Sequence, residues 1–501
     1  MSDLPELLRL KVSQSPQRAT RQTLNSVEHA IFVVPEKPSG QVLRSLPHSP
    51  QLKKLLNRSA SPIVASRLPN DNATGLTLAV LKADSTFERL SWARRVIAGC
   101  LRDNPRSIGI VAAGLDDDTR TAAFTSLVAA AEAAAFALPS FKSKNAARSG
   151  LSSIKLLNCK ARLDLRTTRA ESLGNNIARW FSAMPPNELD ASSYRQAVQE
   201  IAKRHGIEYE FLNERKLKTL GAGAFLAVSQ GNASRDAGVI RLRYRPVGSE
   251  TAAVGLVGKG ILFDTGGTNL KPFKSMLDMH MDMQGSAVAL GTIVALATLE
   301  VPYAVDAWLA VTENRISATA YKSQDIIRAA NGTTIQVIHT DAEGRMVLAD
   351  TLAIAAREKP AIMIDYATLT GTCVSALTER YSGIFSNRPA ANKLLRNAGM
   401  ASGERVWPFP MDADFDELLA SDVADIKQCS TAGLGDHILA ARFLSKFVPE
   451  DIPWVHVDLS AGQSKGGLGH IPSEVTGFGV KLTLELLREQ TPAAIAETLK
   501  A

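Results

Sequence analysis

The chain has 501 residues, of which 45% are hydrophobic and 21% charged, and its formal net charge is +7. A chain of this length exceeds one ordinary hydrophobic core, which predicts two or more domains. No apolar run reaches the roughly 18 residues of a membrane-spanning helix, and the N-terminal segment lacks the apolar core of a secretory signal. The four cysteines lie far apart, as is typical of buried, reduced thiols. We therefore expect a cytoplasmic protein without a membrane partner.

Residues 1–170 predict a smaller N-terminal α/β domain. Short apolar runs indicate strands, and longer mixed or alanine-rich segments indicate helices. The strands are expected at His29–Val34, Leu76–Leu81 and Ser107–Ala113, and the helices at Glu88–Leu101 and Thr119–Phe136. Their alternation predicts a largely parallel sheet. This domain carries no tight cluster of acidic, histidine or cysteine residues, so we assign no chemistry to it.

The charge is distributed unevenly along the chain. Residues 1–170 hold 25 Lys and Arg against 13 Asp and Glu, an excess of +12, whereas the remainder holds 32 against 37, or −5. A basic first third suggests an anionic partner such as nucleic acid. A solvated basic face is an equally good interpretation, because the segment shows no aromatic-interleaved basic stretch and no helix-turn-helix signature.

Residues 171–501 predict a larger C-terminal α/β domain with a mixed, mostly parallel central sheet flanked by helices. Its strands are expected at Glu208–Leu212, Val239–Tyr244, Ala252–Val257, Val305–Val311, Ala361–Tyr366 and Trp454–Leu459. Its helices are expected at Ser172–Ala183, Ala191–His205, Leu217–Val228, Gly285–Leu299, Met346–Glu358 and Ile438–Phe447. Sheets of this kind place ligand sites at the carboxyl ends of their strands.

Two charged segments stand out in the second domain. They read VGKGILFDTGGTNLKP, at Val257–Pro272, and IHTDAEGRMVLADTL, at Ile338–Leu352. The apolar runs Ala253–Val257 and Ile335–Ile338 lead into them, as buried strands would. The two segments supply three aspartates, one glutamate, two lysines and one arginine, and Asp282 follows the first segment by ten residues. Burying so many charges without a counter-ion is costly, which predicts a divalent metal site.

Four carboxylates from these segments can converge. Asp341 and Glu343 share one face if Thr340–Glu343 is extended, because side chains alternate along a strand. Asp264 ends an apolar run, and Asp282 follows a short helical approach. Oxygen ligands suit Mn or Mg, and carboxylate-rich sites also hold Zn. Two ions about 3.5–4 Å apart could clamp the attacking and leaving oxygens of a displacement.

Three basic residues accompany the acids. Lys259 is by default an ion-pair partner, but a desolvated lysine beside cations can also ligate as a neutral amine. Lys271 would stay charged and stabilise an oxyanion on a substrate carbonyl. Arg345 precedes the expected Met346 helix, where its guanidinium and free backbone N–H groups would hold a small anion. A structural salt-bridge network stays open for each charged residue taken singly.

At these residues the sequence resembles the leucyl aminopeptidase family, the M17 cytosol aminopeptidases. The resemblance rests on the KGxxFDxGG, KP and TDAEGR patterns and extends from about Leu173 to Leu487. It includes DYATLTGTCVSAL at Asp365–Leu377 and WVHVDLSAG at Trp454–Gly462. It implies a metalloprotease, a hydrolase that removes the N-terminal residue from peptides and typically assembles as a homohexamer.

The resemblance also implies a role for each matching residue. The ligands of two divalent ions, Mn or Zn, would be Lys259, Asp264, Asp282, Asp341 and Glu343, with Asp264 and Glu343 bridging. Lys271 would polarise the scissile carbonyl. Arg345 would bind a bicarbonate ion acting as general base on the bridging water. Met279, Thr368 and Gly371 would line the pocket for the first side chain, and Leu369 would position the substrate backbone.

The sequence departs from the family pattern around the substrate pocket. His339 stands where Asn is usual, and we expect a hydrogen-bonded wall residue of the substrate site, or alternatively a titrating group that shapes the pH profile. Asn314–Asp325 lacks the usual proline-glycine turn, and Leu434–Ile438 lacks the usual Gly-Gly-Ala stretch. Three hypotheses follow: an active aminopeptidase, a DNA-binding accessory protein acting through the basic first domain, and a weakly active family member with altered specificity.

Overall fold

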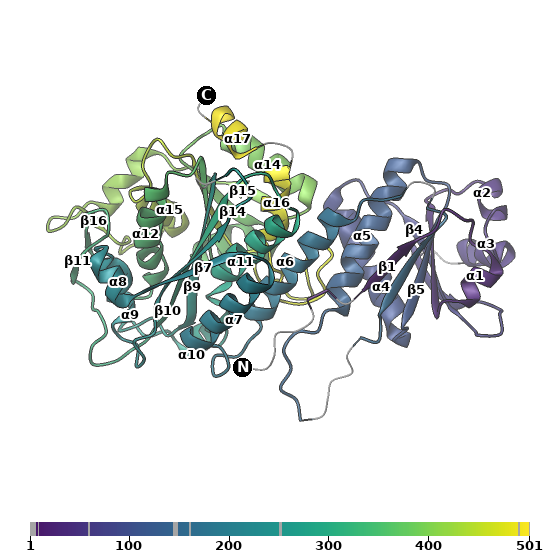
Figure 1. Ribbon diagram of the computed structural model, residues 1–501, viewed down its shortest axis with the longest axis horizontal. Helices are drawn as coiled ribbons and strands as arrows, with labels where there is room; N and C mark the ends of the chain where they lie inside the picture. The colour runs from purple at the N-terminus through teal and green to yellow at the C-terminus, as the bar shows by residue number, and fades with distance from the viewer. Residues whose placement is uncertain are drawn as a thin grey trace. The chain divides into compact units, whose positions relative to one another are not determined.

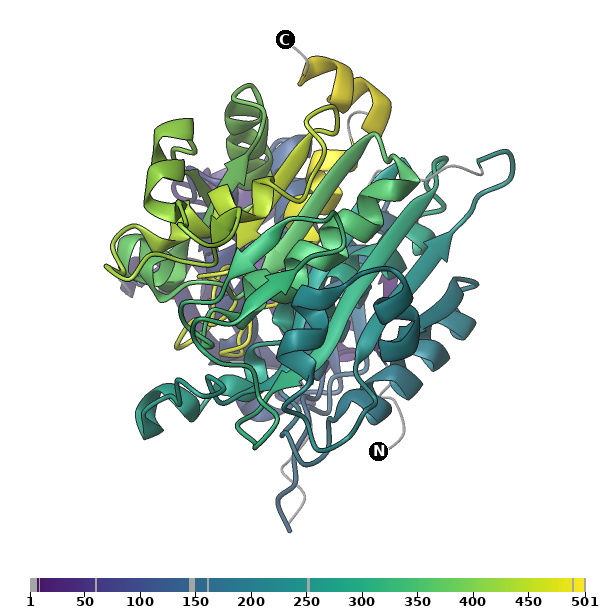
Figure 2. The same ribbon diagram turned by 90° about the vertical axis from the view of Figure 1, so that its left-hand side faces the viewer.

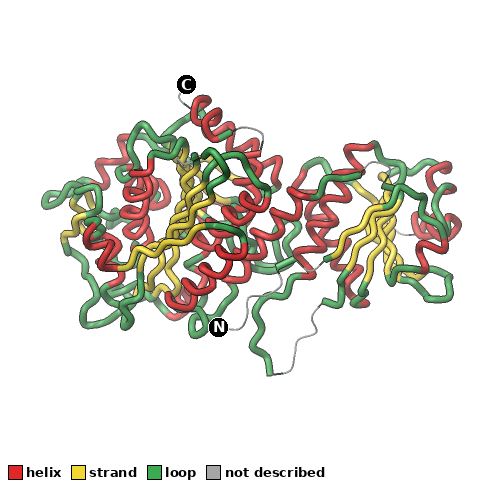
Figure 3. The backbone as a smooth tube through the Cα atoms, in the orientation of Figure 1, coloured by secondary structure: helices red, strands yellow, loops and turns green. Residues whose placement is uncertain are grey.

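The computed structural model describes residues 7–8, 10–58, 61–143, 149–159, 162–249, 253–488 and 491–499. The chain divides into two compact units, a smaller one mainly from Pro5–Ser172 and Gly466–Glu474 and a larger one mainly from Leu173–Lys465 and Val475–Ala501. In both units the strands lie between helices (Figure 3), which is the α/β class expected from the sequence. No helix within the described ranges is both long and apolar enough to cross a membrane.

The smaller unit is built on a six-stranded sheet with the order β1-β6-β5-β2-β4-β3. Its strands are β1 (Lys11–Gln14), β2 (His29–Pro35), β3 (Ile63–Arg67), β4 (Gly75–Leu81), β5 (Ser107–Ala112) and β6 (Ser153–Leu157). All pairings are parallel except that between β3 and β4. The helices are α1 (Arg21–Asn25), α2 (Gly40–Arg44), α3 (Ser49–Arg58), α4 (Thr86–Cys100) and α5 (Asp117–Ala135).

Both faces of the smaller sheet are covered by helices, as Figure 1 shows, which explains its continuous apolar strands. In β2, Ile31 and Val33 belong to the apolar cluster that includes Phe124 of α5. The intervening Phe32 belongs to the cluster on the other face, with Leu52 of α3. The elements expected in this unit are all present within two residues of their predicted bounds.

The larger unit is built on an eight-stranded mixed sheet with the order β15-β14-β17-β13-β9-β10-β8-β7. Its long strands cross the centre of the unit in Figure 2. The four central strands are mutually parallel, namely β17 (Trp454–Asp458), β13 (Ile362–Ala367), β9 (Val254–Asp264) and β10 (Val305–Asn314). The outer strands are β7 (Glu208–Asn213), β8 (Gly238–Tyr244), β14 (Ser382–Ser386) and β15 (Val406–Pro408). A separate three-stranded sheet contains β11 (Ile326–Arg328), β12 (Thr334–Gln336) and β16 (Ile426–Lys427).

Helices cover both faces of the larger sheet. The helices of this unit are α6 (Arg166–Ser182, which begins in the smaller unit), α7 (Ala191–Arg204), α8 (Glu214–Thr219), α9 (Gly223–Ser229), α10 (Phe273–Met276), α11 (Gln284–Thr298), α12 (Glu343–Ala355), α13 (Gly371–Leu377), α14 (Ala391–Ser402), α15 (Asp436–Ser445), α16 (Val480–Arg488) and α17 (Pro492–Thr498). Helices α11 and α12 both contact β9, from opposite faces of the sheet (Figure 1). Because the central strands are parallel, their carboxyl ends share one edge, where such sheets place ligand sites.

Several predicted elements of the larger unit need correction. The strand expected to end at Val257 continues to Asp264, since Lys259 is an interior residue of β9 and not a sign that the strand has ended. The helix expected at Leu217–Val228 is two helices, α8 and α9. They are separated because Gly221, with φ +79°, turns the chain between them.

The apolar run at Ile335–Ile338 was expected to be a buried strand leading to the second charged segment. Only Thr334–Gln336 is a strand, and it belongs to the small three-stranded sheet instead of the central one. Its neighbours are antiparallel β11 and parallel β16. The second charged segment therefore reaches the edge of the central sheet through a loop and the start of α12.

Candidate metal centre

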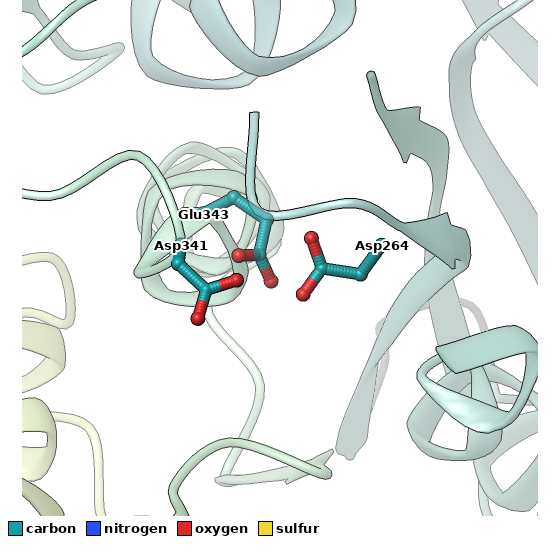
Figure 4. Close-up of side chains that lie close together, drawn as sticks. All are labelled: Asp264, Asp341 and Glu343. Atoms are coloured by element: carbon teal, nitrogen blue, oxygen red, sulfur yellow. The ribbon is translucent and has the colours of Figure 1, made fainter. Parts of the chain in front are cut away.

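Three carboxylates meet at the edge of the central sheet. Asp264 ends β9, Asp341 lies in the turn before α12, and Glu343 opens α12. One oxygen of each lies within 4.8 Å of the others, and Figure 4 shows the three groups turned toward a common point. Asp264 and Glu343 are buried, whereas Asp341 is partly exposed. Oxygen atoms gathered in this way can hold a hard or borderline divalent ion.

The way in which Asp341 and Glu343 converge differs from the prediction. Helix α12 begins at Glu343, three residues before the predicted start, so Thr340–Glu343 is not extended and does not follow the two-residue period of a strand. A turn anchored by Thr340 presents both carboxylates instead. Thr340 Oγ1 donates to the carbonyl oxygen of Gly266 at 2.6 Å, and Tyr321 donates to the Thr340 carbonyl oxygen at 2.7 Å.

Two lysines link the three carboxylates with Asp282. Lys259 Nζ lies 2.7 Å from Asp282 Oδ1 and 3.0 Å from Glu343 Oε1. Lys271 Nζ lies 2.8 Å from Asp264 Oδ2 and 2.6 Å from Asp341 Oδ1. The structure thus brings all four predicted acids and both predicted lysines into one network.

The position of Lys259 depends on a glycine in α12. A Cβ atom added to Gly344 would lie 2.5 Å from Lys259 Cε and 2.7 Å from its Nζ. Such distances are well inside van der Waals contact, so only glycine allows the lysine to cross the first turn of the helix. The glycine of the TDAEGR segment therefore has a packing role beside the carboxylates.

Burial dominates the electrostatics of the centre. It raises the pKa of Glu343 to about 8, with the charge of Asp264 adding to the increase. Burial likewise raises the pKa of Asp282 to about 6, although Lys259 opposes it. For Lys259 itself, burial lowers the pKa, but the carboxylates of Asp282 and Glu343 outweigh burial and hold it above its ordinary value. Four carboxylates facing two ammonium groups leave the centre short of positive charge.

The residues fit a metal ion on a second, independent ground. Asp282 Oδ2 is fully buried and has no hydrogen-bond partner among the described residues. A buried carboxylate oxygen without a partner is costly, and a cation beside it would remove that cost. Lys259 could join such an ion only after losing its proton, which a neighbouring cation favours.

The sequence did not single out Asn314, the last residue of β10. Its Nδ2 donates to Asp264 Oδ1 at 2.8 Å and to the Thr340 carbonyl oxygen at 3.0 Å, and it lies 3.4 Å from Glu343 Oε2. One buried amide therefore orients carboxylates from two of the three segments. The signal available in the sequence was its position, since Asn314 closely follows the apolar strand expected at Val305–Val311, at the end of the strand where such sheets bind ligands.

A cavity of about 400 Å³ opens onto the carboxylates. The residues predicted to bind substrate that line it are Met279, Thr368, Leu369 and Gly371. Thr368 Oγ1 donates to Asp282 Oδ1 at 2.8 Å, and the Thr368 carbonyl oxygen accepts from Lys259 Nζ at 2.9 Å. The Leu369 backbone N–H donates to Asp458 Oδ1 at 3.1 Å, which fixes this loop over the cavity.

The sequence profile of the cytosol aminopeptidase family, catalytic domain, matches residues 176–484. The chain belongs to this family. Probable cytosol aminopeptidases are similar to it, including that of Chlorobaculum tepidum, 41% identical over 316 residues and 62% of each chain. That of Parasynechococcus marenigrum is 38% identical over 367 residues, or 72% of this chain and 75% of the relative. The chain thus matches 62% of the length of the Chlorobaculum relative.

Solved structures of two proteins resemble the whole fold. A lysine-to-glutamate mutant of tomato leucine aminopeptidase is 26% identical, with a TM-score of 0.83 and 98% of both chains covered. The bottromycin maturation enzyme BotP, in complex with Mn, is 25% identical, with a TM-score of 0.78 and coverage of 94% of this chain and 100% of BotP. Both structures support the two-unit α/β fold of this cytosol aminopeptidase family member.

Two residues predicted for the site lie outside the described lining of the cavity. His339 is exposed, and its ring Nδ1 accepts a hydrogen bond from the Asp341 backbone N–H at 3.3 Å. Arg345 is 1% exposed, donating to Asp436 Oδ2 at 2.7 Å and to the Gln428 carbonyl oxygen at 3.2 Å. His339 thus supports the turn that carries Asp341.

Arg345 already holds one anion. The carboxylate of Asp436 accepts a hydrogen bond from its Nη2, and the Gln428 carbonyl oxygen accepts one from its Nη1. Its Nε is buried and has no hydrogen-bond partner among the described residues. The binding of bicarbonate at Arg345 therefore stays a prediction.

Proposed function

We propose that this family member is a metal-dependent aminopeptidase that hydrolyses the N-terminal residue from peptides. The observation that carries the proposal is the network of Asp264, Asp282, Asp341 and Glu343 at the wall of a cavity large enough for an amino-acid residue. Family membership supports the same activity. Nothing in the comparisons or the described residues favours the DNA-binding alternative.

We assign two divalent ions, Mn or Zn, to this centre. Their ligands would be Lys259, Asp264, Asp282, Asp341 and Glu343. The ion pairs support a common site, because Lys259 joins Asp282 with Glu343, and Lys271 joins Asp264 with Asp341. The Mn complex of BotP supports the choice of a divalent metal. When bound, the ions would supply Lewis acidity and a hydroxide nucleophile at neutral pH.

The chain's own residues would bind and orient the peptide. The carboxylates attract the free α-ammonium group, which explains a preference for N-termini. Lys271, whose side chain is 13% exposed toward the cavity, keeps its proton because the adjacent carboxylates raise its pKa against the effect of burial. It would donate that N–H to the scissile carbonyl oxygen and stabilise the developing oxyanion. Leu369 would hold the substrate backbone, and Met279, Thr368 and Gly371 would line the pocket for the first side chain.

Family membership also supports a homohexamer working in the cytoplasm, and size-exclusion chromatography with light scattering would measure the assembly. The activity test is hydrolysis of aminoacyl 4-nitroanilides by protein stripped of metal and then supplied with Mn or Zn. We expect activity only after metal is added, and its loss in Asp341→Asn. Asp422→Asn, at an exposed site, is the matched control. Ordinary turnover by Asp341→Asn would overturn the assignment of the centre.

A further inference from the structure

One wall of the cavity runs outward from the carboxylates along α13. It begins at Thr368, which is hydrogen-bonded to Asp282, and continues with Gly371, Val374 and Glu379, all of which line the cavity. Gly371 and Val374 are three apart and share one helical face. Glu379 follows in the short 3-10 turn Thr378–Arg380. At 1.5 Å per residue, α13 extends roughly 9 Å away from Gly371.

The middle of this wall is open and apolar. A Cβ atom added to Gly371 would meet nothing within 4 Å, so a substrate side chain has room to pass over it. Val374 and Met279 supply apolar surface to the same cavity. A long aliphatic segment could therefore lie along the wall, because burying its apolar surface against Val374 and Met279 is favourable.

The outer part of the wall is polar and anionic. Glu379 is partly buried, and its Oε2 accepts a hydrogen bond from the Lys465 backbone N–H at 3.0 Å. Asp278 is a second carboxylate lining the cavity outside the metal centre, and Gln463 adds an amide. Within the described ranges neither Glu379 nor Asp278 forms an ion pair.

No basic side chain in the described lining of the cavity is free to pair with Glu379 or Asp278. The basic residues in its described lining are Lys259 and Lys271, and both are held by acids of the metal centre. A substrate that brings a positive charge to the outer wall would gain a charge-assisted hydrogen bond. A substrate that covers Glu379 with an apolar group would leave a carboxylate desolvated and unpaired.

We propose that this cavity selects peptides whose N-terminal residue is lysine or arginine. The inference rests on the proposed aminopeptidase function. The α-amine would lie at the metal centre, the aliphatic stem would pass Gly371 between Met279 and Val374, and the cationic head would reach Glu379. Lysine and arginine side chains combine an apolar stem with a charged end in this order. Glu379 is then the residue that sets specificity, with Asp278 adding to the negative potential.

The test compares kcat/KM for lysyl, arginyl, leucyl and methionyl 4-nitroanilides on the metal-loaded protein. We expect the two basic substrates to be preferred at least 10-fold over leucyl. Glu379→Gln should lower kcat/KM for the basic substrates about 10–100-fold, mainly through KM, and leave the leucyl value unchanged or higher. Glu417→Gln, at an exposed position in the 3-10 segment Ala413–Leu419, is the control and should change neither.

The outcomes separate this inference from the function on which it rests. If no substrate is hydrolysed with metal present, the aminopeptidase proposal itself fails. If kcat/KM for the leucyl substrate equals that for the lysyl substrate, only the inferred specificity is overturned. The same holds if Glu379→Gln lowers kcat/KM for all four substrates alike. Asp278→Asn provides a second variant should Glu379→Gln lose its fold, and it should weaken the basic substrates selectively.

Discussion

The guanidinium of Arg345 donates a hydrogen bond to Asp436 Oδ2 over 2.7 Å in a place where Arg345 is 1% exposed. The same guanidinium holds the carbonyl oxygen of Gln428, whose side chain in turn accepts from the Ile338 and His339 backbone N–H groups at 3.1 Å and donates to the Ala342 carbonyl oxygen at 3.0 Å. The ion pair is therefore continuous with the turn that carries Asp341. Asp436 supplies both a counter-charge and support for the metal centre.

Replacing Asp436 with Asn should weaken the fold and change how the enzyme responds to anions. The variant leaves a buried guanidinium without its carboxylate, which should cost roughly 2 kcal/mol, less than the about 3–5 kcal/mol of a fully buried pair, because the Asp436 side chain is 27% exposed. Urea unfolding measures this change, with Asp451→Asn at an exposed site as control. Because Asp436 already supplies an anion to Arg345, added bicarbonate should raise the turnover of the variant more than that of the wild type. Equal responses of the two proteins to bicarbonate would contradict the role given to Asp436.

Asn314→Ala should lower metal affinity without removing a ligand. The amide orients Asp264 and the turn at Thr340, and loss of such supporting hydrogen bonds typically costs 10–100-fold in metal affinity or activity. Isothermal titration with Mn measures the dissociation constant directly. Asn331→Ala is the comparison, because that amide donates to the Lys446 carbonyl oxygen away from the centre. Equal affinities in the two variants would show that Asn314 is not needed for positioning.

Glu132→Gln should stabilise the smaller unit at neutral and alkaline pH. Glu132 on α5 is 2% exposed, and burial raises its pKa from 4.5 to about 7 despite Arg169 nearby. Since the folded-state pKa is raised, the protonated form favours folding below pH 4.5, and that contribution is lost as pH rises toward 7. This pKa shift corresponds to a loss of roughly 3 kcal/mol of folding stability at most when the carboxyl ionises, and the neutral amide would not incur that loss.

Thermal unfolding of wild-type and Glu132→Gln protein between pH 4.5 and 8 would measure this difference. The difference in unfolding temperature between variant and wild type should increase with pH, while the exposed Glu450→Gln control should unfold like wild type. A difference in unfolding temperature that stays constant across this pH range would mean that folding does not change the pKa of Glu132.

The sequence predicted that these charged residues lie together because its signals are local. Asp264 and Lys259 end or interrupt an apolar strand, and Asp341 and Glu343 are two residues apart, so chemistry and place could be inferred together. The geometry behind that inference was partly wrong. Glu343 opens a helix, and its convergence with Asp341 depends on hydrogen bonds from Tyr321 and Thr340 that no spacing reveals.

The partners that complete the site are distant in the chain. Asp436 lies 91 residues from Arg345, and Gln428 lies 83 residues from it. Their contacts arise only when α15 and the strand β16 pack against α12 and its preceding turn. In the smaller unit the apolar runs predicted β2, β4 and β5, because burial on both faces of the sheet makes each of these strands a near-continuous apolar run.

The most direct test of the account is the number of divalent ions that the folded chain binds. Equilibrium dialysis of metal-stripped protein against Mn, with the bound metal counted per chain, measures it without reference to any substrate. The account predicts two ions per chain in the wild type, and a deficit in Glu343→Gln while Asp422→Asn still binds two. A wild-type chain that binds none, or a Glu343→Gln variant that binds as much as wild type, would contradict it.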